Sequence, residues 1–394
     1  MGSMNVNFIS EALHNLRNEF VARGKDLRAV GGAVRDTLAG SVIKDVDLCT
    51  DATPDEQIKI YEELGLRFIP TGLEHGTVSV VLDGEVHEIT SLRVDVETDG
   101  RHAKVEFTSD WEADLGRRDL TINAMALTFD GVLIDPFGGA ADLANGVVRF
   151  VGNADARIKE DYLRILRWFR FLGRYGNLDN LDAATVESIK QNVNGLKQIS
   201  RERVWSEVQR IVAHDRGPAL MELMTQVGVA NASGLHYGFE SPNGVPNAVM
   251  RLEHAQQVTR NPEVLMAAWL GWDENETARL AHNWKWSNVE REHASWIAAN
   301  MHAERDLRRL IAIDGVKREW VVELAALEQR DGWEQNALAF WEFAPFPVTG
   351  NDLIAAGVKP GMAMGVMLRD LKEAWFRSGY SASKEELMAN VKKD

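Results

Sequence analysis

The stretch GGAVRDTLAGSVIKDVDLCT, residues 31–50, decides the fold of the first third of the chain. It follows the short apolar run RAV, which we interpret as a strand that turns at Gly31-Gly32 into a helix. Glycine lets backbone N–H groups approach an anion closely, and an arginine one turn into the helix, Arg35, is near enough to bind the same anion. The pattern therefore predicts an anion-binding corner built from Gly31, Gly32 and Arg35.

Two aspartates, Asp45 and Asp47, belong to a second expected strand, DVDLCT. Because alternate residues of a strand point to the same face, both carboxylates would leave the sheet together. Such a pair can hold Mg²⁺ ions between a nucleoside triphosphate and an attacking hydroxyl. A lone Asp-x-Asp is more often a solvated strand end, but the glycine pair and Arg35 nearby favour catalysis. We therefore assign Asp45 and Asp47 as catalytic metal ligands.

A hairpin is the clearest local prediction, because TVSVVLDGEVHEITSLR, residues 77–93, contains two alternating runs around Asp83-Gly84. Glu88 lies in the second run and is our candidate for a third catalytic carboxylate, although an exposed strand residue explains it equally well. Helical patterns alternate with strands up to about Phe150. From Arg157 onward, apolar residues recur at three- and four-residue spacing. We predict an α+β fold in which a domain with a mixed sheet precedes an all-helical remainder.

Length and composition limit the classes of protein. The 394 residues suffice for two to four domains with a sizeable core. The single cysteine, Cys49, excludes internal disulfides and cysteine-rich zinc sites. No apolar run approaches the ~20 residues of a membrane span, and no secretory signal opens the chain, so we expect no membrane partner and a cytoplasmic location. Residues 1–3 resemble a cloning remnant.

The net charge of −15 ordinarily argues against a polyanionic partner, but the charge is unevenly distributed. Residues 157–174 contain six arginines and lysines against Glu160 and Asp161, a net charge of +4. Binding of a nucleic acid would rest on such local basic surfaces.

A further segment, RRDLTINAMA, residues 117–126, places two arginines and an aspartate before a mostly apolar run. We interpret it as a helix start or a strand-to-helix corner with Ile122, Ala124, Met125 and Ala126 buried. Asp119 would then cap the helix. Two arginines there would oppose the helix dipole, and an anionic ligand would remove that conflict.

Five segments of the chain resemble, in order, the five motifs of class II tRNA nucleotidyltransferases. They are GGAVRD with DVDLCT, RRDLTINAMAL, DPFGGAADL, EDYLRILRWFRF and ISRERVWSE. These are the CCA-adding enzymes, which share ancestry with bacterial poly(A) polymerases. The segment VTGNDLIAAGVKPGMAMGVML is similar to the tail of bacterial members. The resemblance implies a nucleotidyltransferase head at 4–150, a neck at 151–215, a body at 216–300 and a tRNA-binding tail at 301–394.

The resemblance also implies a reaction. The 3′-hydroxyl of a tRNA would attack the α-phosphate of CTP or ATP and release pyrophosphate, with Mg²⁺ held by Asp45 and Asp47. A bacterial poly(A) polymerase and a partial enzyme that adds only CC or only A remain alternatives, and a non-catalytic RNA-binding protein is a more distant one. The oligomeric state stays open.

Base selection is assigned to EDYLR, where Asp161 and Arg164 lie three residues apart on an expected helix. Cytosine and adenine each present an amino donor beside a ring-nitrogen acceptor. Uracil and guanine present an oxygen acceptor beside an N–H donor. Since aspartate only accepts and arginine only donates, the pair fits C and A and mispairs with U and G. In an isolated Asp-x-x-Arg, a surface ion pair is the better interpretation.

Other assignments follow from the resemblance. The nucleotide sugar and phosphates would be contacted by Arg117, Arg118, Asp119 and Asn123, with Asp119 distinguishing ribose from deoxyribose, and we add Arg167 and Arg170 of the basic helix. Asp135 would help to couple head and neck movements. Supporting positions would be Glu160, Arg203 and Glu207, with Ser200 as an N-cap and Arg203 paired to Glu207.

Residues 91–116 are polar and poorly periodic, and we expect a mobile loop there. In the family, a flexible loop at this place helps to switch specificity from CTP to ATP, and enzymes that add only CC lack it. We assign Arg93, Asp99 and Arg101 as its functional members. The presence of the loop favours full CCA addition.

Overall fold

A seven-stranded mixed sheet forms the centre of the N-terminal part of the chain. The computed structural model describes residues 4, 6–43, 45–98, 103–235, 244–389 and 391. The chain divides into two compact units, Met1–Val245 and Pro246–Asp394. This division falls inside the body expected at 216–300, and the four-domain boundaries stay a prediction.

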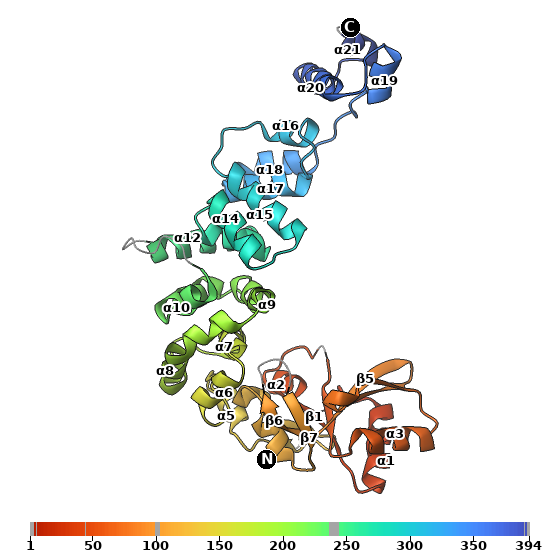
Figure 1. Ribbon diagram of the computed structural model, residues 1–394, viewed down its shortest axis with the longest axis vertical. Helices are drawn as coiled ribbons and strands as arrows, with labels where there is room; N and C mark the ends of the chain where they lie inside the picture. The colour runs from red at the N-terminus through yellow and green to blue at the C-terminus, as the bar shows by residue number, and fades with distance from the viewer. Residues whose placement is uncertain are drawn as a thin grey trace. The chain divides into compact units, whose positions relative to one another are not determined.

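The sheet has the order β3-β4-β5-β2-β1-β8-β9, in which β2 and β5 run parallel and the other neighbours run antiparallel. Figure 1 labels β1 and β5 of this sheet. The predicted mixed sheet is confirmed. Its strands are β1 (Leu27–Val30), β2 (Leu48–Thr50), β3 (Phe68–Gly72), β4 (Thr77–Leu82), β5 (Glu85–Ser91), β8 (Ala126–Thr128) and β9 (Leu133–Ile134).

The predicted hairpin between β4 and β5 is confirmed as well. Asp83 and Gly84 have φ of 50° and 87°, so both adopt the left-handed conformation that a type I′ turn requires. The register pairs Ser79 with Glu88, which fixes the place of Glu88 in the sheet.

Helices cover the sheet because their apolar faces supply its core. Leu16 and Phe20 of α1 and Tyr61 of α3 are buried with Leu27 and Ile89 of the strands. A capping box of Thr53 with Glu56 begins α3. The helices of this part are α1 (Glu11–Ala22), α2 (Gly32–Leu38), α3 (Pro54–Glu63), α4 (Trp111–Gly116) and α5 (Gly139–Ala144), with the 3₁₀ turns η1 (Leu73–His75) and η2 (Thr121–Asn123).

The expectation of an irregular loop at residues 91–116 is wrong for the residues that the structure describes. They form a second, two-stranded sheet of β6 (Arg93–Thr98) and β7 (Ala103–Phe107), followed by α4. Both strands alternate apolar with polar or charged residues, Val94 and Val96 in β6 and Ala103, Val105 and Phe107 in β7, so the strand pattern was present in the sequence and was overlooked. Asp99 and Arg101 lie outside the described residues.

After the head, the described residues of the same unit continue with helices only, of which α6 to α9 lie in the neck expected at 151–215. Its helix α7 packs against α9, and Trp168 and Phe169 of α7 and Val204 and Val208 of α9 are buried. The Trp168 Nε1–H donates to the carbonyl of Val148, at 2.8 Å, which fixes the neck to the end of the head. The helices are α6 (Ala154–Glu160), α7 (Leu163–Tyr175), α8 (Ala183–Asn192), η3 (Val193–Gln198), α9 (Arg201–Val212), α10 (Gly217–Gln226) and α11 (Val229–Ser233).

Arg35 of α2 joins the head to α7. Its guanidinium is buried, and its carbon Cζ lies 4.5 Å from the ring centroid of Tyr175 and 5.0 Å from that of Phe171. The guanidinium also pairs with Asp36, at 3.0 Å. Since the Tyr175 hydroxyl donates to the same Asp36 carboxylate, the cation, the acid and the aromatic ring lock α2 and α7 together.

The second unit is helical throughout its described residues, and α13, α15 and α17 meet around the buried His293. The imidazole lies between the carboxylates of Glu263, at 2.9 Å, and Glu323, at 2.7 Å, and stacks on Trp320. The helices are α12 (Gly244–Gln256), α13 (Pro262–Trp269), α14 (Glu274–Asn283), α15 (Asn288–Asn300), α16 (Leu307–Ala312), α17 (Arg318–Leu327), α18 (Gly332–Ala339), α19 (Gly350–Ala355), α20 (Met362–Arg377) and α21 (Lys384–Met388).

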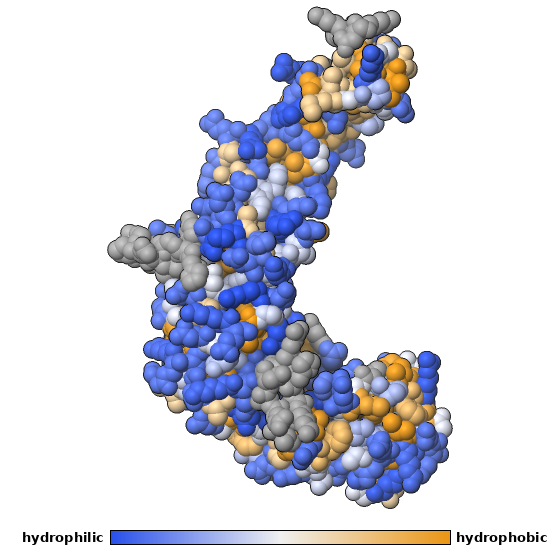
Figure 2. Space-filling model, in the orientation of Figure 1, coloured by the Kyte–Doolittle hydropathy of each residue, from blue (hydrophilic) through white to orange (hydrophobic). Residues whose placement is uncertain are grey.

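The surface is mostly hydrophilic on the face that Figure 2 shows, where apolar residues form separate patches. Among the described residues, no helix combines the length and the apolar character needed to cross a membrane.

The stability of the second unit should depend on pH through His293. Burial alone lowers the pKa of this imidazole, but the hydrogen bonds to Glu263 and Glu323 outweigh burial and raise the pKa to about 9. A raised pKa stabilises the fold fully below the unfolded value of ~6.5, and this contribution disappears as the pH rises through about 9. We expect the wild-type chain to lose on the order of 2 kcal/mol of unfolding free energy between pH 7 and 10 by this route.

Denaturant unfolding of the full chain at both pH values measures this loss. Between these pH values H293Q should lose on the order of 2 kcal/mol less than the wild type, whereas H282Q, at an exposed histidine of α14, should lose as much as the wild type. An equal loss in wild type and H293Q would contradict the assignment.

A second prediction concerns the lock between head and neck. Y175F removes the hydroxyl that donates to Asp36 and keeps the ring that faces Arg35. We expect the free energy of unfolding to fall by about 1 kcal/mol, the usual contribution of one hydrogen bond. Denaturant unfolding of the full chain measures the difference, and an unchanged midpoint would show that the hydroxyl contributes nothing to the lock.

Candidate functional site

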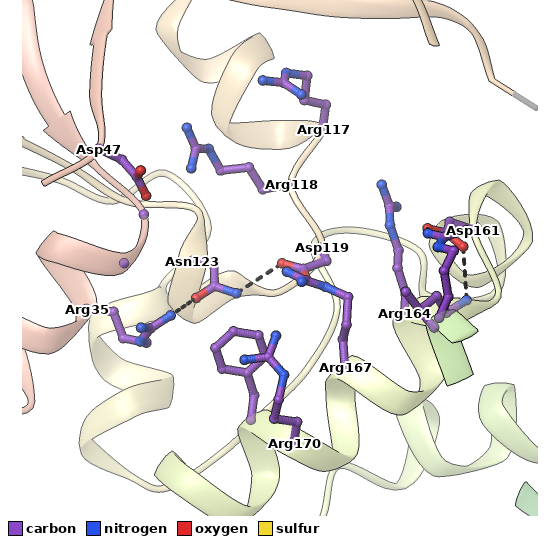
Figure 3. A pocket seen from close by; sticks show the side chains of 15 residues that line it. Arg35, Asp47, Arg117, Arg118, Asp119, Asn123, Asp161, Arg164, Arg167 and Arg170 are labelled. Carbon is purple, nitrogen blue, oxygen red and sulfur yellow. Dashed lines mark hydrogen bonds and ion pairs between the residues drawn. The ribbon is translucent and has the colours of Figure 1, made fainter. Parts of the chain in front are cut away.

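A pocket of about 520 Å³ lies where the head meets α7, and seven arginines line it (Figure 3). It brings together all the residues predicted to bind the nucleotide, from segments far apart in the sequence. The lining consists of Gly31, Gly32, Arg35, Asp47, Arg117, Arg118, Asp119, Asn123, Asp161, Leu163, Arg164, Arg167, Arg170, Phe171 and Arg203. Predicted site residues outside this lining are Asp45, Glu88, Asp135, Glu160 and Glu207.

The expected corner between strand and helix is present at Gly31. This glycine has φ of 63°, a left-handed conformation, and it precedes α2 directly after β1. A Cβ atom added to Gly31 would lie 2.7 Å from Nη1 of Arg118, closer than real contacts allow. The position therefore needs glycine both for its backbone and for the space that the arginine fills.

The two aspartates do not lie in a strand as expected, because β2 begins only at Leu48. Hydrogen bonding still fixes Asp47, whose carbonyl accepts from the N–H of Val30 at 3.0 Å. Since Leu48 pairs with Ile89 in the parallel register, Asp47 lies next to Glu88 of β5. The prediction of Glu88 as a neighbour of the aspartates thus has a structural counterpart, although its role stays a prediction.

The electrostatic surroundings of Asp47 are those of a crowded acid. Restricted hydration raises the pKa of the Asp47 carboxyl, and the negative charges of Asp45 and Glu88 raise it further. The positive charges of Arg118 and Arg35 act in the opposite direction and lower this pKa. A divalent cation would relieve the repulsion among these carboxylates. The described residues contain no group of three or more acidic, histidine or cysteine side chains placed to hold a metal ion by themselves. Further ligands would have to come from a substrate.

RRDLTINAMA does not start a helix, contrary to our expectation. Arg117 is the C-cap of α4, so the two arginines follow the C-terminal end of a helix, where a positive charge interacts favourably with the dipole. Thr121–Asn123 form the 3₁₀ turn η2. The apolar part of the segment is buried as predicted, with Ile122, Ala124, Met125 and Ala126 fully inaccessible.

Asp114 of α4 holds both arginines and was missed by the sequence analysis. Its Oδ1 accepts from Nε of Arg117 at 2.9 Å, and its Oδ2 accepts from Nη2 of Arg118 at 3.4 Å. The aspartate itself is fully buried. The spacing of three and four residues between Asp114 and the arginines is the signal that would have revealed it, had α4 been recognised as a helix.

Cys49 lies under Arg118, with its Sγ 3.7 Å from Nη2. Burial is the main cause that raises the pKa of this thiol to about 11. The thiol is therefore neutral at physiological pH and leaves the charge of Arg118 to Asp114.

Asp119 connects the head to the neck and does not cap η2 as the alternative interpretation expected. Its Oδ2 accepts from Nε of Arg167 at 2.7 Å, and its Oδ1 accepts from Nδ2 of Asn123 at 3.0 Å. Asn123 in turn accepts from Nη1 of Arg35 at 2.5 Å. Burial raises the pKa of Asp119, but the charge of Arg167 and the hydrogen bonds from Asn123 and Arg167 outweigh burial and lower it. Figure 3 marks the bonds of Asn123 with Arg35 and with Asp119.

Asp161 and Arg164 do not lie on one continuous helix. The chain is extended at Asp161, with φ of −154°, between the end of α6 and the start of α7. The Asp161 carboxylate accepts from Arg203 at 2.7 Å, while Arg164 donates to Glu160 at 2.6 Å. Both side chains line the pocket although each has its own partner.

The predicted pair of Arg203 with Glu207 is wrong. Arg203 reaches Asp161, and Glu207 accepts from Nε of Arg170 at 2.6 Å. These pairs connect α9 to Asp161, which precedes α7, and to Arg170 of α7, rather than running along the helix. Ser200 occupies the N-cap position of α9, but its side chain makes no capping hydrogen bond.

Asp135 binds the first turn of the helix that follows it in the chain, α5. Its carboxylate accepts from the backbone N–H groups of Gly139 at 2.7 Å and Ala140 at 2.9 Å, which fixes the start of α5. Helix α5 packs against η2, so the aspartate supports the pocket wall indirectly. Its expected part in coupling head and neck movements stays a prediction.

The pocket is strongly cationic for a chain of net charge −15. Its seven arginines face three lining aspartates, a formal excess of four positive charges. Several arginines are oriented by acids outside the lining, namely Asp36, Asp114, Glu160 and Glu207. The pocket therefore has the charge for a polyphosphate and, at Asp161 and Arg164, oriented groups for a polar ring.

Comparison with known proteins agrees with this geometry. Residues 27–149 match the family described as Poly A polymerase head domain, and residues 180–233 match Probable RNA and SrmB- binding site of polymerase A. The CCA tRNA nucleotidyltransferase 1, mitochondrial, of Mus musculus is 38% identical over 406 aligned residues, covering 98% of this chain and 90% of the relative. The protein of that name in Homo sapiens is 37% identical with the same coverage.

A solved structure extends the likeness to three dimensions. The Bacillus stearothermophilus CCA-adding enzyme in complex with CTP aligns with a TM-score of 0.78 and 27% identity, covering 98% of this chain and 97% of that one.

The expectation of a cytoplasmic location is contradicted by these relatives, because the mouse and human proteins are named mitochondrial. The expectation rested on the lack of recognisable signals, and a lack of signals does not identify a compartment.

The identity to the mouse and human relatives extends over nearly the whole chain and includes the segments that line the pocket. This chain belongs to the CCA tRNA nucleotidyltransferases and is an enzyme of the nucleotidyltransferase class.

Proposed function

We propose that this enzyme adds or repairs the 3′-terminal CCA of tRNA with CTP and ATP and without a template. The observation that carries the proposal is the pocket in which seven arginines, Arg164 among them, lie together with Asp47 and Asp161. It combines cations for a triphosphate with a fixed acceptor and a fixed donor for a base. The names of the mouse and human relatives and the CTP complex of the Bacillus stearothermophilus enzyme support the same substrates.

In the proposed reaction, the 3′-oxygen of the tRNA forms a bond to the α-phosphorus of the nucleotide. The bond from this phosphorus to the bridging oxygen breaks, and pyrophosphate leaves. Arg117 and Arg118 are placed to neutralise the triphosphate, and Gly31 and Gly32 leave space for its oxygens. Protein side chains need to form no covalent bond, so positioning and charge supply the catalysis.

The acidic cluster, by which we mean Asp45, Asp47 and Glu88, suits Mg²⁺. This ion prefers a few carboxylate oxygens together with substrate phosphates. Asp45 and Asp47 would hold it, and the repulsion that raises the pKa of Asp47 is relieved by such a cation. Bound there, Mg²⁺ would activate the attacking hydroxyl and offset the charge of the triphosphate, in a mechanism with two metal ions. Glu88, next to Asp47 in the sheet, is our candidate for a supporting carboxylate.

Base selection follows from hydrogen-bond polarity. Asp161 offers an acceptor to the amino group of cytosine or adenine, and Arg164 offers a donor to the ring nitrogen beside it. Arg203 and Glu160 hold these two side chains in place. Uracil or guanine would leave buried polar groups unmatched, at a cost of ~1 to 3 kcal/mol for each group.

A bacterial poly(A) polymerase is the second candidate, because residues 27–149 match a family described by that name. A partial enzyme that adds only CC or only A would have the same head.

One assay separates these candidates. Purified protein is incubated with tRNA that ends before the CCA, with CTP alone, ATP alone, both, or dCTP. We expect two added residues with CTP and three with both nucleotides, since the pocket accepts both bases. D47N should abolish addition. A poly(A) polymerase would instead extend with ATP alone, and efficient use of dCTP would contradict the role of Asp119 in recognising ribose.

A further prediction concerns selection. E160Q removes the anion that orients Arg164 and leaves Asp161 with Arg203. We expect misincorporation of UTP and GTP, relative to CTP and ATP, to rise about tenfold, the effect of losing roughly one oriented hydrogen bond. E187Q, at an exposed position of α8, is the matched control. Unchanged nucleotide preference in E160Q would contradict the positioning role of Glu160.

Exchanging Asp161 and Arg164 in a double variant, D161R/R164D, tests base selection less well than E160Q does. D161R would place a cation against Arg203, and R164D would place an anion against Glu160. Loss of activity in that double variant would therefore follow from repulsion, whichever base the pocket selects.

A further inference from the structure

We propose that Asp114 is a positioning residue that sets the triphosphate affinity of the enzyme by holding Arg117 and Arg118 in place. The inference rests on the proposed function, because it concerns the nucleotide of that reaction. Asp114 touches no part of the pocket itself, and it would act only through the two arginines that line the pocket.

Asp114 is fully buried, and its contacts are directional. Oδ1 accepts from Nε of Arg117 at 2.9 Å, and Oδ2 accepts from Nη2 of Arg118 at 3.4 Å. The Asp114 side chain has 1% of its surface exposed and those of Arg117 and Arg118 have 19% each, so both bonds are partly shielded from water. Charge-assisted hydrogen bonds of this kind are stronger and more directional than neutral ones.

The two arginines need such an anion because they are adjacent cations. Arg118 lies against Gly31 on one side and near the neutral thiol of Cys49 on another, and neither group can balance its charge. The Nε of Arg118 is buried and has no hydrogen-bond partner among the residues that the structure describes. A buried, incompletely bonded guanidinium beside a glycine corner is a group prepared for an anionic ligand.

Asp114 also keeps Arg118 away from the acidic cluster. Asp47 is another of the acids that act on the charge of Arg118. Without Asp114, the balance would shift toward a direct pair of Arg118 with Asp47. In such a pair, the Asp47 carboxylate would be less available to a metal ion, and the Arg118 guanidinium would be less available to the triphosphate.

The same carboxylate fixes the hairpin of β6 and β7. Oδ1 of Asp114 accepts from the backbone N–H of Arg93, the first residue of β6, at 3.2 Å. The base of the hairpin and the two arginines therefore share one anchor.

The test compares D114N with the control E112Q, an exposed glutamate of the same helix. D114N keeps the shape of the side chain and removes its charge. Equilibrium affinities for CTP, CDP and CMP are measured, together with KM and kcat for addition of C to tRNA. We expect the affinity of D114N for CTP to fall about tenfold, that for CMP to change little, and KM to rise more than kcat falls.

An equal loss of affinity for all three nucleotides, or a lower kcat with unchanged KM, would overturn the proposal in favour of a purely structural role. Unchanged CTP binding would overturn it as well. Failure of the proposed function is distinguishable, since then the wild-type enzyme itself would not add CCA.

A second variant serves if D114N does not fold. D114N/R117Q removes one anion and one cation together, which preserves the net charge of the buried group. We expect it to bind CTP more weakly than R117Q alone, because Arg118 has also lost its anchor. Equal affinity in these two variants would mean that Asp114 does not act through Arg118, and the proposal would fail.

Discussion

The buried guanidinium of Arg35 is the contact on which the rest of the site depends. It lies against two aromatic rings of α7, pairs with Asp36 and donates to Asn123. A cation removed from water in this way is tolerated only while its partners remain in place. Every partner belongs either to the head or to α7, so the bond network that satisfies Arg35 also determines where the neck meets the sheet. The position of the pocket follows from that junction.

The pocket illustrates how a protein of strongly negative charge can hold an anion. Neighbouring acids form ion pairs with the guanidinium groups of its lining and hold them in fixed positions before a ligand binds. Pairing lowers the net field of each arginine, but it removes the cost of ordering seven flexible side chains when the nucleotide binds. The ion pairs weaken the attraction of the arginines for an anion but fix the orientation of their N–H groups. Fixed orientation matters most where a base must be chosen by hydrogen-bond polarity.

Local patterns in the sequence predicted a mixed sheet, the strands β1, β2, β4 and β5 and the hairpin at Asp83-Gly84, while the family resemblance supplied most of the residues that line the pocket. What the sequence could not supply was the pairing among those residues. Arg203 was matched with Glu207 because the two lie one turn apart, whereas the fold brings Asp161 to the first and Arg170 to the second. Likewise, Asp114 has no motif of its own and gains its importance only from α4. Partners of this kind are set by tertiary distances, which periodicity does not encode.

The position of the single cysteine has a practical consequence. Cys49 is buried beneath Arg118, and its pKa of about 11 leaves almost no thiolate at neutral pH. Because thiolate is the reactive species, the native chain is nearly inert toward maleimides and other thiol reagents. A cysteine introduced on the surface of either unit can thus carry a fluorophore or a spin label without prior removal of the natural one. The enzyme is in this sense already prepared for distance measurements during its catalytic cycle.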